Sequence, residues 1–252
     1  MKKTAIIAHR GKKEFFPENT LISFAEAVKA GADGIELDVY LSADGVLVVH
    51  HDYLLGNTDN GAGLIYEKNI AYIKSLDAGS WFAAKFRGEK IPTLDEVFRN
   101  FGKTIEFEIE LKGFDRKFVD SFLTLVKKYD LLKRIEITSA NLPLVMTAKK
   151  SEPKIRSGIF ISPRQSWMSQ ELAQKIALSQ ITLGDFAVAH CPVSLLTPDW
   201  VGRLQASGIL VHAADCDESA DLNMALALRV DQLSTSKLDR ALAEREFFLK
   251  RK

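Results

Sequence analysis

The sequence Gly34-Ile-Glu36-Leu-Asp38-Val-Tyr-Leu-Ser-Ala-Asp-Gly45-Val-Leu-Val-Val-His50-His51-Asp52 predicts two strands joined by a tight turn. Residues 34–41 alternate and are rich in β-forming residues, and residues 46–49 form a run rich in valine. Between them, residues 42–45 have turn composition, with glycine at the last position. A connection this short cannot cross to a parallel strand, so we expect the two arms to pair antiparallel.

This hairpin gathers acidic and basic side chains in one place. Glu36 and Asp38 are two residues apart, so both point to the same face of the strand. Folding the arms about the Ala43–Asp44 bond brings His51 level with Glu36. Two carboxylates beside a histidine are typical of a hydrolytic metal site. The hairpin alone equally fits an edge hairpin with solvated charges, so the rest of the chain has to decide between the two interpretations.

The composition is that of an ordinary globular protein and shows no bias toward nucleic acid. The chain has 252 residues, of which 46% are hydrophobic, and its 34 basic and 33 acidic residues give a formal net charge of +1. Cys191 and Cys216 form no CxxC motif and are expected to be free thiols in a reducing compartment. The apolar run at residues 4–8 is too short for a signal peptide, and no run approaches the length of a membrane span. We therefore expect a cytoplasmic protein.

Predicted strands and helices alternate along the chain. Without the second arm of the hairpin, eight parallel strands are predicted, at residues 4–8, 34–40, 104–111, 134–138, 156–161, 185–189, 209–213 and 230–234, with a helix over residues 169–179 before the sixth strand. Eight such units predict an α/β fold, the (β/α)₈ TIM barrel. An open doubly wound sheet is the alternative, but no strand is followed by a glycine-rich dinucleotide-binding motif. No repeat or linker divides the chain, so we expect residues 1–252 to form a single domain.

The longest irregular stretch, residues 52–90, follows the hairpin as a small insertion. Trp81 and Phe82 supply apolar surface that can order it. A connection of this length in a compact domain is typical of a lid or a binding loop. A helix is expected to follow, with Thr93 as its cap and Glu96 at the third helical position, which together form a capping box.

Charged side chains end the first three strands of the predicted barrel. His9 and Arg10 follow the first strand, and Glu110 and Lys112 end the third. The hairpin between them contributes the two carboxylates and the histidine described above. Barrel active sites lie at the C-terminal ends of the strands, and these three strands are neighbours. We therefore expect all of these side chains to meet at one rim, with structural ion pairs as the alternative.

The types of these residues indicate the chemistry. The three carboxylates of Glu36, Asp38 and Glu110, without a thiol, make a hard oxygen site suited to Mg²⁺ or Ca²⁺. Arg10 and Lys112 add fixed positive charge, which makes the site a clamp for an anionic oxygen, above all that of a phosphate. The two histidines then supply one general base and one general acid. The pattern predicts metal-assisted phosphoryl transfer at a phosphodiester.

Ordered motifs extend this pattern along nearly the whole chain. They are His9-Arg10-Gly11, Pro17-Glu18-Asn19-Thr20, Glu36-Leu-Asp38, His51-Asp52, Asp77-Ala-Gly-Ser-Trp81 with Phe86 and Gly88, Ile91-Pro92-Thr93-Leu94 and Glu110-Leu-Lys112. In these motifs the chain resembles the glycerophosphodiester phosphodiesterase family, in its small bacterial cytoplasmic branch. The resemblance implies a barrel of the phosphoinositide-phospholipase-C-like kind. It also implies an enzyme, a phosphoric diester hydrolase, that converts glycerophosphodiesters to glycerol 3-phosphate and an alcohol.

The resemblance further implies a role for each site residue. It implies His9 and His51 as the acid/base pair, Glu36, Asp38 and Glu110 as ligands of one divalent cation, Mg²⁺ or Ca²⁺, and Arg10 and Lys112 as phosphate-binding residues. Asn19 would order the loop behind His9, and Asp52 would orient His51. The implied partner is a small-molecule glycerophosphodiester. The oligomeric state, the alcohol and the attacking oxygen stay open at this point.

The chain departs from the family pattern at a few positions that shape the pocket. The Arg-Thr pair that often follows His-Asp appears as Leu55-Gly56-Asn57-Thr58, the Trp-Thr of the seventh strand as His212-Ala213, and the Thr-Asp of the eighth as Thr235-Ser236. His190 and His212 either line the pocket or are hydrogen-bonded histidines of the core. Glu108 shares the parity of Glu110 and is either a neighbour of the metal ligands or a residue buried lower in the barrel.

Two other functions are consistent with these departures. One is a lysophospholipase D-like phosphodiesterase on lysophospholipids, for which the insertion (Tyr53, Leu54, Leu55, Trp81 and Phe82) would supply an apolar groove for an acyl chain. The other is a binding protein built on an inactive barrel. The complete set of metal-ligating residues and histidines argues against the second of these alternatives.

Overall fold

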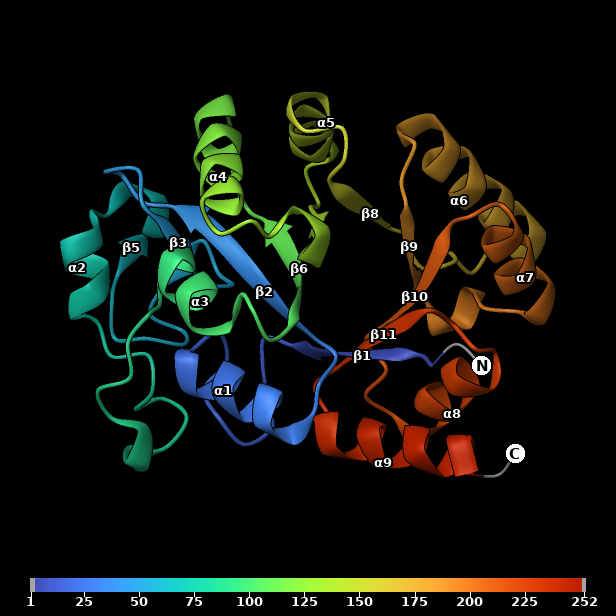
Figure 1. The fold of residues 1–252 in the computed structure, drawn as a ribbon, viewed down its shortest axis with the longest axis horizontal. Coiled ribbons are helices and arrows are strands. Elements are labelled where there is room, and N and C mark those ends of the chain that lie inside the picture. Colours follow the sequence, from blue (N-terminus) through green and yellow to red (C-terminus); the bar gives the residue numbers. More distant parts are fainter. Residues whose placement is uncertain (1–2, 251–252) are drawn as a thin grey trace.

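The computed structural model describes residues 3–250, and its parallel strands close into a barrel (Figure 1). The eight parallel strands in this range are β1 (Ala5–His9), β2 (Gly34–Leu41), β6 (Glu106–Leu111), β7 (Ile135–Thr138), β8 (Arg156–Phe160), β9 (Val188–Pro192), β10 (Leu210–Ala214) and β11 (Gln232–Thr235). Closure comes from β1, which pairs in parallel with both β2 and β11. The predicted TIM barrel is therefore confirmed. Residues 1–2 and 251–252 of the predicted domain lie outside the described residues.

Helices surround this barrel on its outer side (Figure 1). They are α1 (Leu21–Ala30), α3 (Leu94–Phe101), α4 (Arg116–Lys128), α5 (Leu142–Ser151), α6 (Gln170–Gly184), α7 (Pro198–Ala206), α8 (Ser219–Ala227) and α9 (Leu238–Lys250), with short 3₁₀ turns η3 (Leu132–Arg134) and η4 (Val193–Leu195) between elements. Successive side chains along each strand point alternately to the barrel interior and to the outer face that the helices cover. On β2, Ile35 and Leu37 belong to the main hydrophobic core, so Glu36 and Asp38 have the opposite parity and face the barrel interior.

The hairpin forms as predicted, with a register that differs by one residue. β3 (Leu47–Val49) pairs antiparallel with β2, and Val49 lies opposite Val39. The expected register, with His51 level with Glu36, was wrong, because the loop has three residues and Gly45 takes a left-handed conformation with φ 87°. His50 is the residue opposite Asp38, and its N–H donates to the Asp38 carbonyl over 3.0 Å. Because the ladder ends at Val49, the chain can turn and carry the His51 side chain toward the barrel mouth.

The insertion lies beside the hairpin, at the left of Figure 1. It contains β4 (Leu54–Leu55), β5 (Gly63–Leu64), η1 (Ile65–Glu67), α2 (Ile70–Ser75) and η2 (Ala84–Phe86). Leu55, Ile65 and Ile73 form a small hydrophobic cluster with Tyr40 and Val48 of the hairpin. The stretch that lacks a clear sequence pattern is therefore held by a core of its own, and this core fixes it on the C-terminal half of β2.

Aromatic and polar contacts order the second half of the insertion. Phe82 contacts Trp81 and Phe86 at ring-centroid distances of 5.6 and 5.7 Å, and Phe86 contacts Phe16 from the loop after β1 at 5.5 Å. The Asp77 carboxylate accepts hydrogen bonds from the N–H groups of Gly79, Ser80 and Gly88. These bonds join the two ends of the Asp77–Gly88 segment through one carboxylate. The contact between Phe86 and Phe16 ties the insertion to the loop after β1, which carries Arg10.

The sixth parallel strand lies three residues later than predicted. β9 starts at Val188, whereas the sequence pattern indicated residues 185–189. The preceding helix α6 runs to Gly184 because Ala173, Ala177 and Ile181 continue a buried stripe at a spacing of four residues. Asp185 ends the helix in the left-handed conformation, with φ 49°. The shift puts His190 in the middle of the strand, inside the barrel wall, and not after its end.

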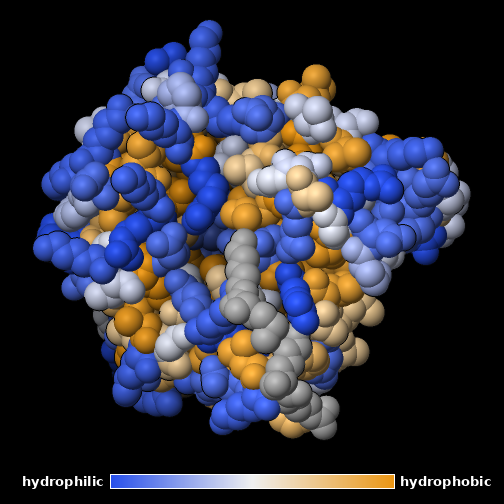
Figure 2. All heavy atoms as spheres, turned by 45° about the vertical axis from the view of Figure 1, so that its right-hand side comes forward, coloured by the Kyte–Doolittle hydropathy of each residue, from blue (hydrophilic) through white to orange (hydrophobic). Residues whose placement is uncertain are grey.

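The helix that follows the insertion starts at the predicted cap. Thr93 and Glu96 form the predicted capping box at the start of α3. On the face that carries α6, α7, α8 and α9, hydrophobic residues are interspersed among hydrophilic ones (Figure 2). Within residues 3–250, no helix combines the length and the apolar character that crossing a membrane requires.

Candidate active site

The three predicted carboxylate ligands meet inside the C-terminal mouth of the barrel. Glu36 and Asp38 lie on β2, and Glu110 lies opposite Asp38 in the parallel register of β6. One oxygen from each carboxylate lies within 4.8 Å of the others. Asp38 is 1% exposed, and its Oδ1 has no hydrogen-bond partner among the described residues. Three oxygen donors around one point, one of them without a hydrogen bond, fit a hard divalent cation.

These carboxylates perturb one another. Burial and the charge of Asp38 raise the pKa of Glu36 well above its usual value, against the opposing effect of Arg10. Burial also raises the pKa of Glu110, with Lys112 opposing and Asp38 adding to the effect. For Asp38, the effect of burial is outweighed by Lys112 and Arg10, and its pKa is lowered. A bound divalent cation would relieve this repulsion, because its charge favours the ionised form of every ligand.

Two cationic side chains flank the carboxylates. The Lys112 ammonium lies 2.8 Å from Glu110 Oε1 and 3.3 Å from Asp38 Oδ1, and Arg10 Nε lies 3.5 Å from Asp38 Oδ2. The loop after β1 positions Arg10, whose φ is 58° and whose N–H donates to Glu36 Oε2 over 3.0 Å. Its guanidinium also donates to Glu18 over 2.9 Å. Arg10 and Lys112 therefore place fixed positive charge at the mouth, next to the oxygen donors.

His51 reaches the same site from the end of the hairpin. Its Nδ1 lies 2.6 Å from Asp52 Oδ1, and Asn57 donates to the other Asp52 oxygen over 2.9 Å. This arrangement places the ring proton on Nδ1 and leaves Nε2 as the free nitrogen. The neighbouring His50 bonds to Asp59 of the insertion, with Nε2 3.0 Å from Asp59 Oδ2, so it faces away from the carboxylates.

His9 approaches the carboxylates from β1. Its Nε2 lies 3.7 Å from Glu36 Oε2, and its Nδ1 lies 3.1 Å from the Lys13 ammonium and 3.7 Å from Asp215 Oδ1. Burial lowers the pKa of His9 to about 3, and the charges of Lys13 and Arg10 act in the same direction. His9 thus lies beside the carboxylate cluster, and His51 is close enough to lower the pKa values of Asp38 and Glu110 in the same cluster.

Some of these neighbours were not predicted from the sequence. Lys13 follows His9-Arg10-Gly11 by only two positions, but nothing in its local pattern indicates that its ammonium turns back to His9. Asp215 directly follows β10, so the rule that strand ends carry the site could have identified it. Asn19, expected to order the loop, donates from Nδ2 to Asp38 Oδ2 over 2.9 Å. Asn19 therefore acts directly on a predicted metal ligand.

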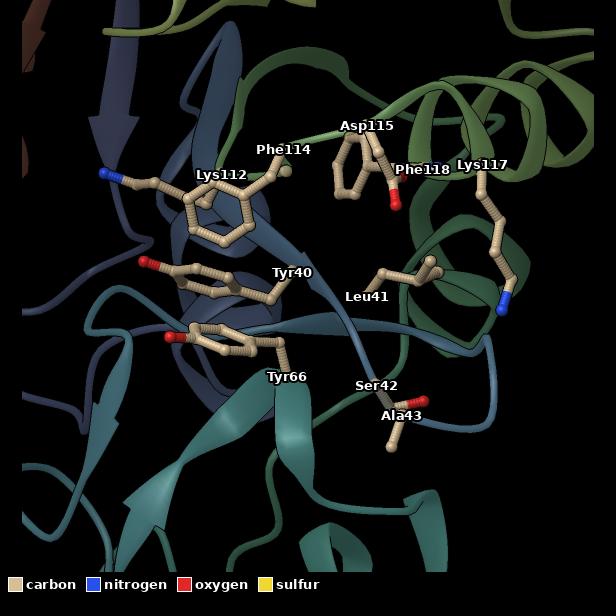
Figure 3. Close-up of a pocket in the computed structure, with 11 residues that line it drawn as sticks. Tyr40, Leu41, Ser42, Ala43, Tyr66, Lys112, Phe114, Asp115, Lys117 and Phe118 are labelled. Carbon is tan, nitrogen blue, oxygen red and sulfur yellow. Dashed lines mark hydrogen bonds between the residues drawn. The ribbon is translucent and has the colours of Figure 1, made fainter.

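A cavity of about 230 Å³ opens beside Lys112 and is lined by aromatic rings from the hairpin, the insertion and the loop before α4. Figure 3 shows the Tyr40 and Tyr66 hydroxyls and the Lys112 amino group pointing to the same side, whereas Lys117 lies on the opposite side. Tyr66 and Phe114 are in edge contact at 5.4 Å. The Tyr40 hydroxyl donates to the carbonyl of His51 over 3.4 Å. Because Tyr66 belongs to the insertion, this segment forms part of the wall next to the site.

A sequence model described as the glycerophosphoryl diester phosphodiesterase family matches residues 9–240. The chain belongs to this family. The match spans all seven predicted site residues, from His9 to Lys112. Membership in the glycerophosphoryl diester phosphodiesterase family confirms the predicted family and the predicted class of enzyme, a phosphodiester hydrolase.

Relatives in the glycerophosphoryl diester phosphodiesterase family align over most of the chain. A glycerophosphodiester phosphodiesterase of Caldanaerobacter subterraneus is 33% identical over 241 residues, which cover 92% of this chain and 94% of that protein. One of Bacillus subtilis is 30% identical and covers 92% of this chain and 83% of that protein. A solved structure from Oleispira antarctica, a phosphodiesterase in complex with the product sn-glycerol-3-phosphate, is 28% identical, with a TM-score of 0.83 and 96% of each chain covered.

Proposed function

We propose that this protein is a metal-dependent phosphodiesterase that hydrolyses glycerophosphodiesters to glycerol 3-phosphate and an alcohol. The observation that carries the proposal is a single barrel mouth that holds three carboxylates, two cationic side chains and two histidines. The names of the relatives support the choice of substrate, as does the glycerol 3-phosphate bound to the Oleispira antarctica enzyme. A single catalytic domain over residues 1–252 and a cytoplasmic location stay predictions from the sequence.

Glu36, Asp38 and Glu110 would hold the cation, for which we propose Mg²⁺ or Ca²⁺. All of their donor atoms are carboxylate oxygens, which these hard cations prefer. When bound, the cation polarises a phosphoryl oxygen and neutralises part of its charge. Asn19 keeps Asp38 in place through its 2.9 Å hydrogen bond and leaves Oδ1 of that carboxylate without a hydrogen bond.

Arg10 and Lys112 bind the phosphate of the substrate in this proposal. Nε of Arg10 is buried and has no hydrogen-bond partner among the described residues, so this donor is available to a phosphate oxygen. The Lys112 ammonium contacts two carboxylates and carries a third N–H. Positive groups fixed in a partly buried site stabilise charge that develops on the phosphoryl oxygens without having to reorganise.

His9 and His51 transfer the protons. One ring accepts the proton of the attacking oxygen as it bonds to phosphorus, and the other donates a proton to the departing alkoxide as its bond to phosphorus breaks. Asp52 holds the proton of His51 on Nδ1 and stabilises the imidazolium that forms when Nε2 accepts a second proton. Lys13 lies 3.1 Å from His9 Nδ1, so Nε2 of His9 is the nitrogen that faces Glu36 and the mouth of the barrel.

Lysophospholipid hydrolysis is not the favoured function. Leu55 is buried in the small core of the insertion. Phe82 packs between Trp81 and Phe86. Two of the five apolar side chains that were expected to form an acyl-chain groove, Leu55 and Phe82, therefore stabilise the insertion itself. Tyr53 and Leu54 stay exposed, at 59% and 52%.

The test is release of glycerol 3-phosphate from glycerophosphoethanolamine by protein stripped of metal with a chelator. We expect no release until Mg²⁺ or Ca²⁺ is added, and release thereafter. Absence of release from folded protein with either ion would refute the proposed reaction. Lysophosphatidylcholine as a parallel substrate is expected to be turned over more slowly, and the reverse preference would favour the alternative.

Variants of the two histidines test their roles. His9→Ala and His51→Ala are each expected to lower kcat by about 10²- to 10⁴-fold, the usual contribution of a general acid or base. His50→Gln is the matched control, because this neighbour of His51 bonds to Asp59 outside the site. Unchanged kcat in both alanine variants would contradict the acid/base assignment.

A further inference from the structure

The barrel interior holds a second polar cluster, which the proposed reaction does not use. It consists of Glu108 on β6, His190 on β9 and His212 on β10, and we call these residues the interior cluster. Glu108 precedes Glu110 by two residues on the same strand, so the cluster lies deeper in the barrel than the carboxylate site. The three residues are only 5%, 2% and 0% exposed. One ligand atom from each lies within 4.8 Å of the others.

The spacing inside the interior cluster suits coordination of an ion. Glu108 Oε1 lies 3.4 Å from His190 Nδ1, and Oε2 lies 3.4 Å from His212 Nδ1. Both separations are longer than a good N–H···O hydrogen bond. A tetrahedral zinc ion with ligand bonds near 2.0–2.1 Å keeps its donors about 3.3 Å apart. One carboxylate group and two ring nitrogens therefore lie close enough to share one ion.

The surroundings of His190 match those of a metal-bound histidine. Its Nε2 lies 2.6 Å from Glu136 Oε1, so Nε2 is the nitrogen that donates to this carboxylate and Nδ1 is the nitrogen that faces Glu108. Glu136 in turn accepts a hydrogen bond from Gln232 over 2.9 Å and lies 3.4 Å from Arg156 Nε. A carboxylate that holds the far nitrogen of the imidazole is the usual second partner of a metal-ligating histidine.

Two atoms of the interior cluster lack partners. Glu108 Oε2 and His212 Nε2 are buried and have no hydrogen-bond partner among the described residues. Buried polar atoms in proteins are nearly always paired. Glu108 also faces other acids, because Glu36 on β2 and Glu136 on β7 are its neighbours in register. The missing element at Glu108 is thus a positive charge, because no lysine or arginine within residues 3–250 is found in an ion pair with it.

Gly158 on β8 leaves room for the contact between His190 and Glu136. A Cβ atom at this position would lie 2.5 Å from His190 Nε2 and 2.8 Å from Glu136 Oε1. Any larger residue would therefore displace the pair that orients His190. Glycine is required here by the close approach of two side chains, and not by the backbone conformation of the strand.

We propose that Glu108, His190 and His212 bind a second metal ion, of the zinc class, inside the barrel. Two imidazoles and one carboxylate select Zn²⁺ over Mg²⁺ or Ca²⁺, which prefer oxygen donors only. Binding replaces the hydrogen bond between the Gln232 amide and His212 Nδ1, which are 3.0 Å apart. The ion joins β6, β9 and β10 across the interior and sets a positive charge beneath Glu36, so we assign it a structural role.

The test measures zinc bound to the full-length chain. Protein produced without a metal-binding tag is stripped with a chelator, incubated with Zn²⁺ in excess Mg²⁺, dialysed and analysed for metal content. We expect one retained zinc equivalent and a higher melting temperature than that of the stripped protein. Zinc retention below 0.1 equivalents on average by folded protein would overturn the proposal, because a shared proton would then account for the interior cluster.

Variants assign the retained zinc to one of the two sites. Glu108→Gln is expected to weaken zinc binding by about 100-fold or more and to abolish the rise in melting temperature. Glu110→Gln changes a residue of the carboxylate site at the mouth, not a residue of the interior cluster, and should retain zinc, as should Ser157→Ala, which removes a buried hydroxyl of β8 outside the interior cluster. Loss of zinc in Glu110→Gln with retention in Glu108→Gln would place the ion at the mouth and refute the interior site.

A spectroscopic measurement on the unmodified chain keeps the proposal testable if Glu108→Gln does not fold. Co²⁺ in place of Zn²⁺ should give visible absorption bands of a low-coordinate site, and the imidazole ¹⁵N resonances of His190 and His212 should shift. Shifts confined to His9 and His51 would contradict the proposal. Because no substrate is turned over in either measurement, failure of the proposed phosphodiesterase reaction would not affect the outcome.

Discussion

Replacing Lys112 by methionine tests the electrostatics of the candidate active site, because it removes one charge and keeps most of the side-chain volume. The ammonium lies 2.8 Å from Glu110 and 3.3 Å from Asp38. At an effective dielectric constant of about 20, the two attractions amount to about 6 and about 5 kcal/mol before desolvation is subtracted. Breaking a buried ion pair costs about 3–5 kcal/mol in net terms. We expect the low end, about 3 kcal/mol, because Arg10 stays beside Asp38.

The loss of stability in Lys112→Met should depend on pH. Lys112 lowers the pKa of Asp38, so the stability that this carboxylate contributes is present above its usual value of 3.8 and is lost as the pH falls through the lowered pKa. In the variant, the pKa values of Asp38 and Glu110 rise, and protonation removes the repulsion between them. The difference in unfolding free energy between the two proteins is therefore largest near pH 7 and shrinks below about pH 4.

Urea denaturation in the presence of a chelator, at pH 7 and again at acid pH, measures this difference. Lys117→Met is the matched control, because Lys117 is exposed in the first turn of α4, and its substitution should change stability by less than about 0.5 kcal/mol. The value of kcat/KM for glycerophosphoethanolamine should also fall by about 10²- to 10³-fold in Lys112→Met. Equal effects of the two substitutions, or a stability loss that does not change with pH, would refute the reasoning.

Three further predictions concern the scaffold. Burial alone would lower the pKa of His50, but the hydrogen bond to Asp59 and the contact with the Asp52 carbonyl raise it. The unfolding free energy lost in His50→Gln should therefore be largest below pH 6.5 and shrink as the pH rises through the raised pKa; a constant loss would contradict this. Thr93→Ala removes the capping box of α3 and should cost about 1 kcal/mol in a urea titration, an effect that would be missing if the cap were irrelevant. Phe122→Ala empties a fully buried position and should cost about 3–5 kcal/mol by the same measurement, whereas a loss below 1 kcal/mol would mean that the core closes around the gap.

Local sequence pattern was sufficient to predict the barrel and to place the charged side chains at its mouth. Strand and helix periods are local properties, so eight alternating units were countable without any knowledge of contacts. The C-terminal ends of parallel strands share one rim, so residues directly after a strand, such as His9 and Lys112, could be placed together from their positions alone. Glu36 and Asp38 are two residues apart. Because side-chain direction alternates along any strand, they could be placed on one face.

Which interior side chains meet, and in which register, depends on contacts between distant parts of the chain. Local pattern could not distinguish a two-residue from a three-residue loop at Gly45. The register therefore differs by one residue from the expected one, and His50 lies opposite Asp38. Nor could local pattern show that Glu108 faces His190 and His212, about 80 and 100 residues further along the chain. Those contacts arise only when the barrel closes, because closure and strand stagger set the level at which each inward-facing residue lies.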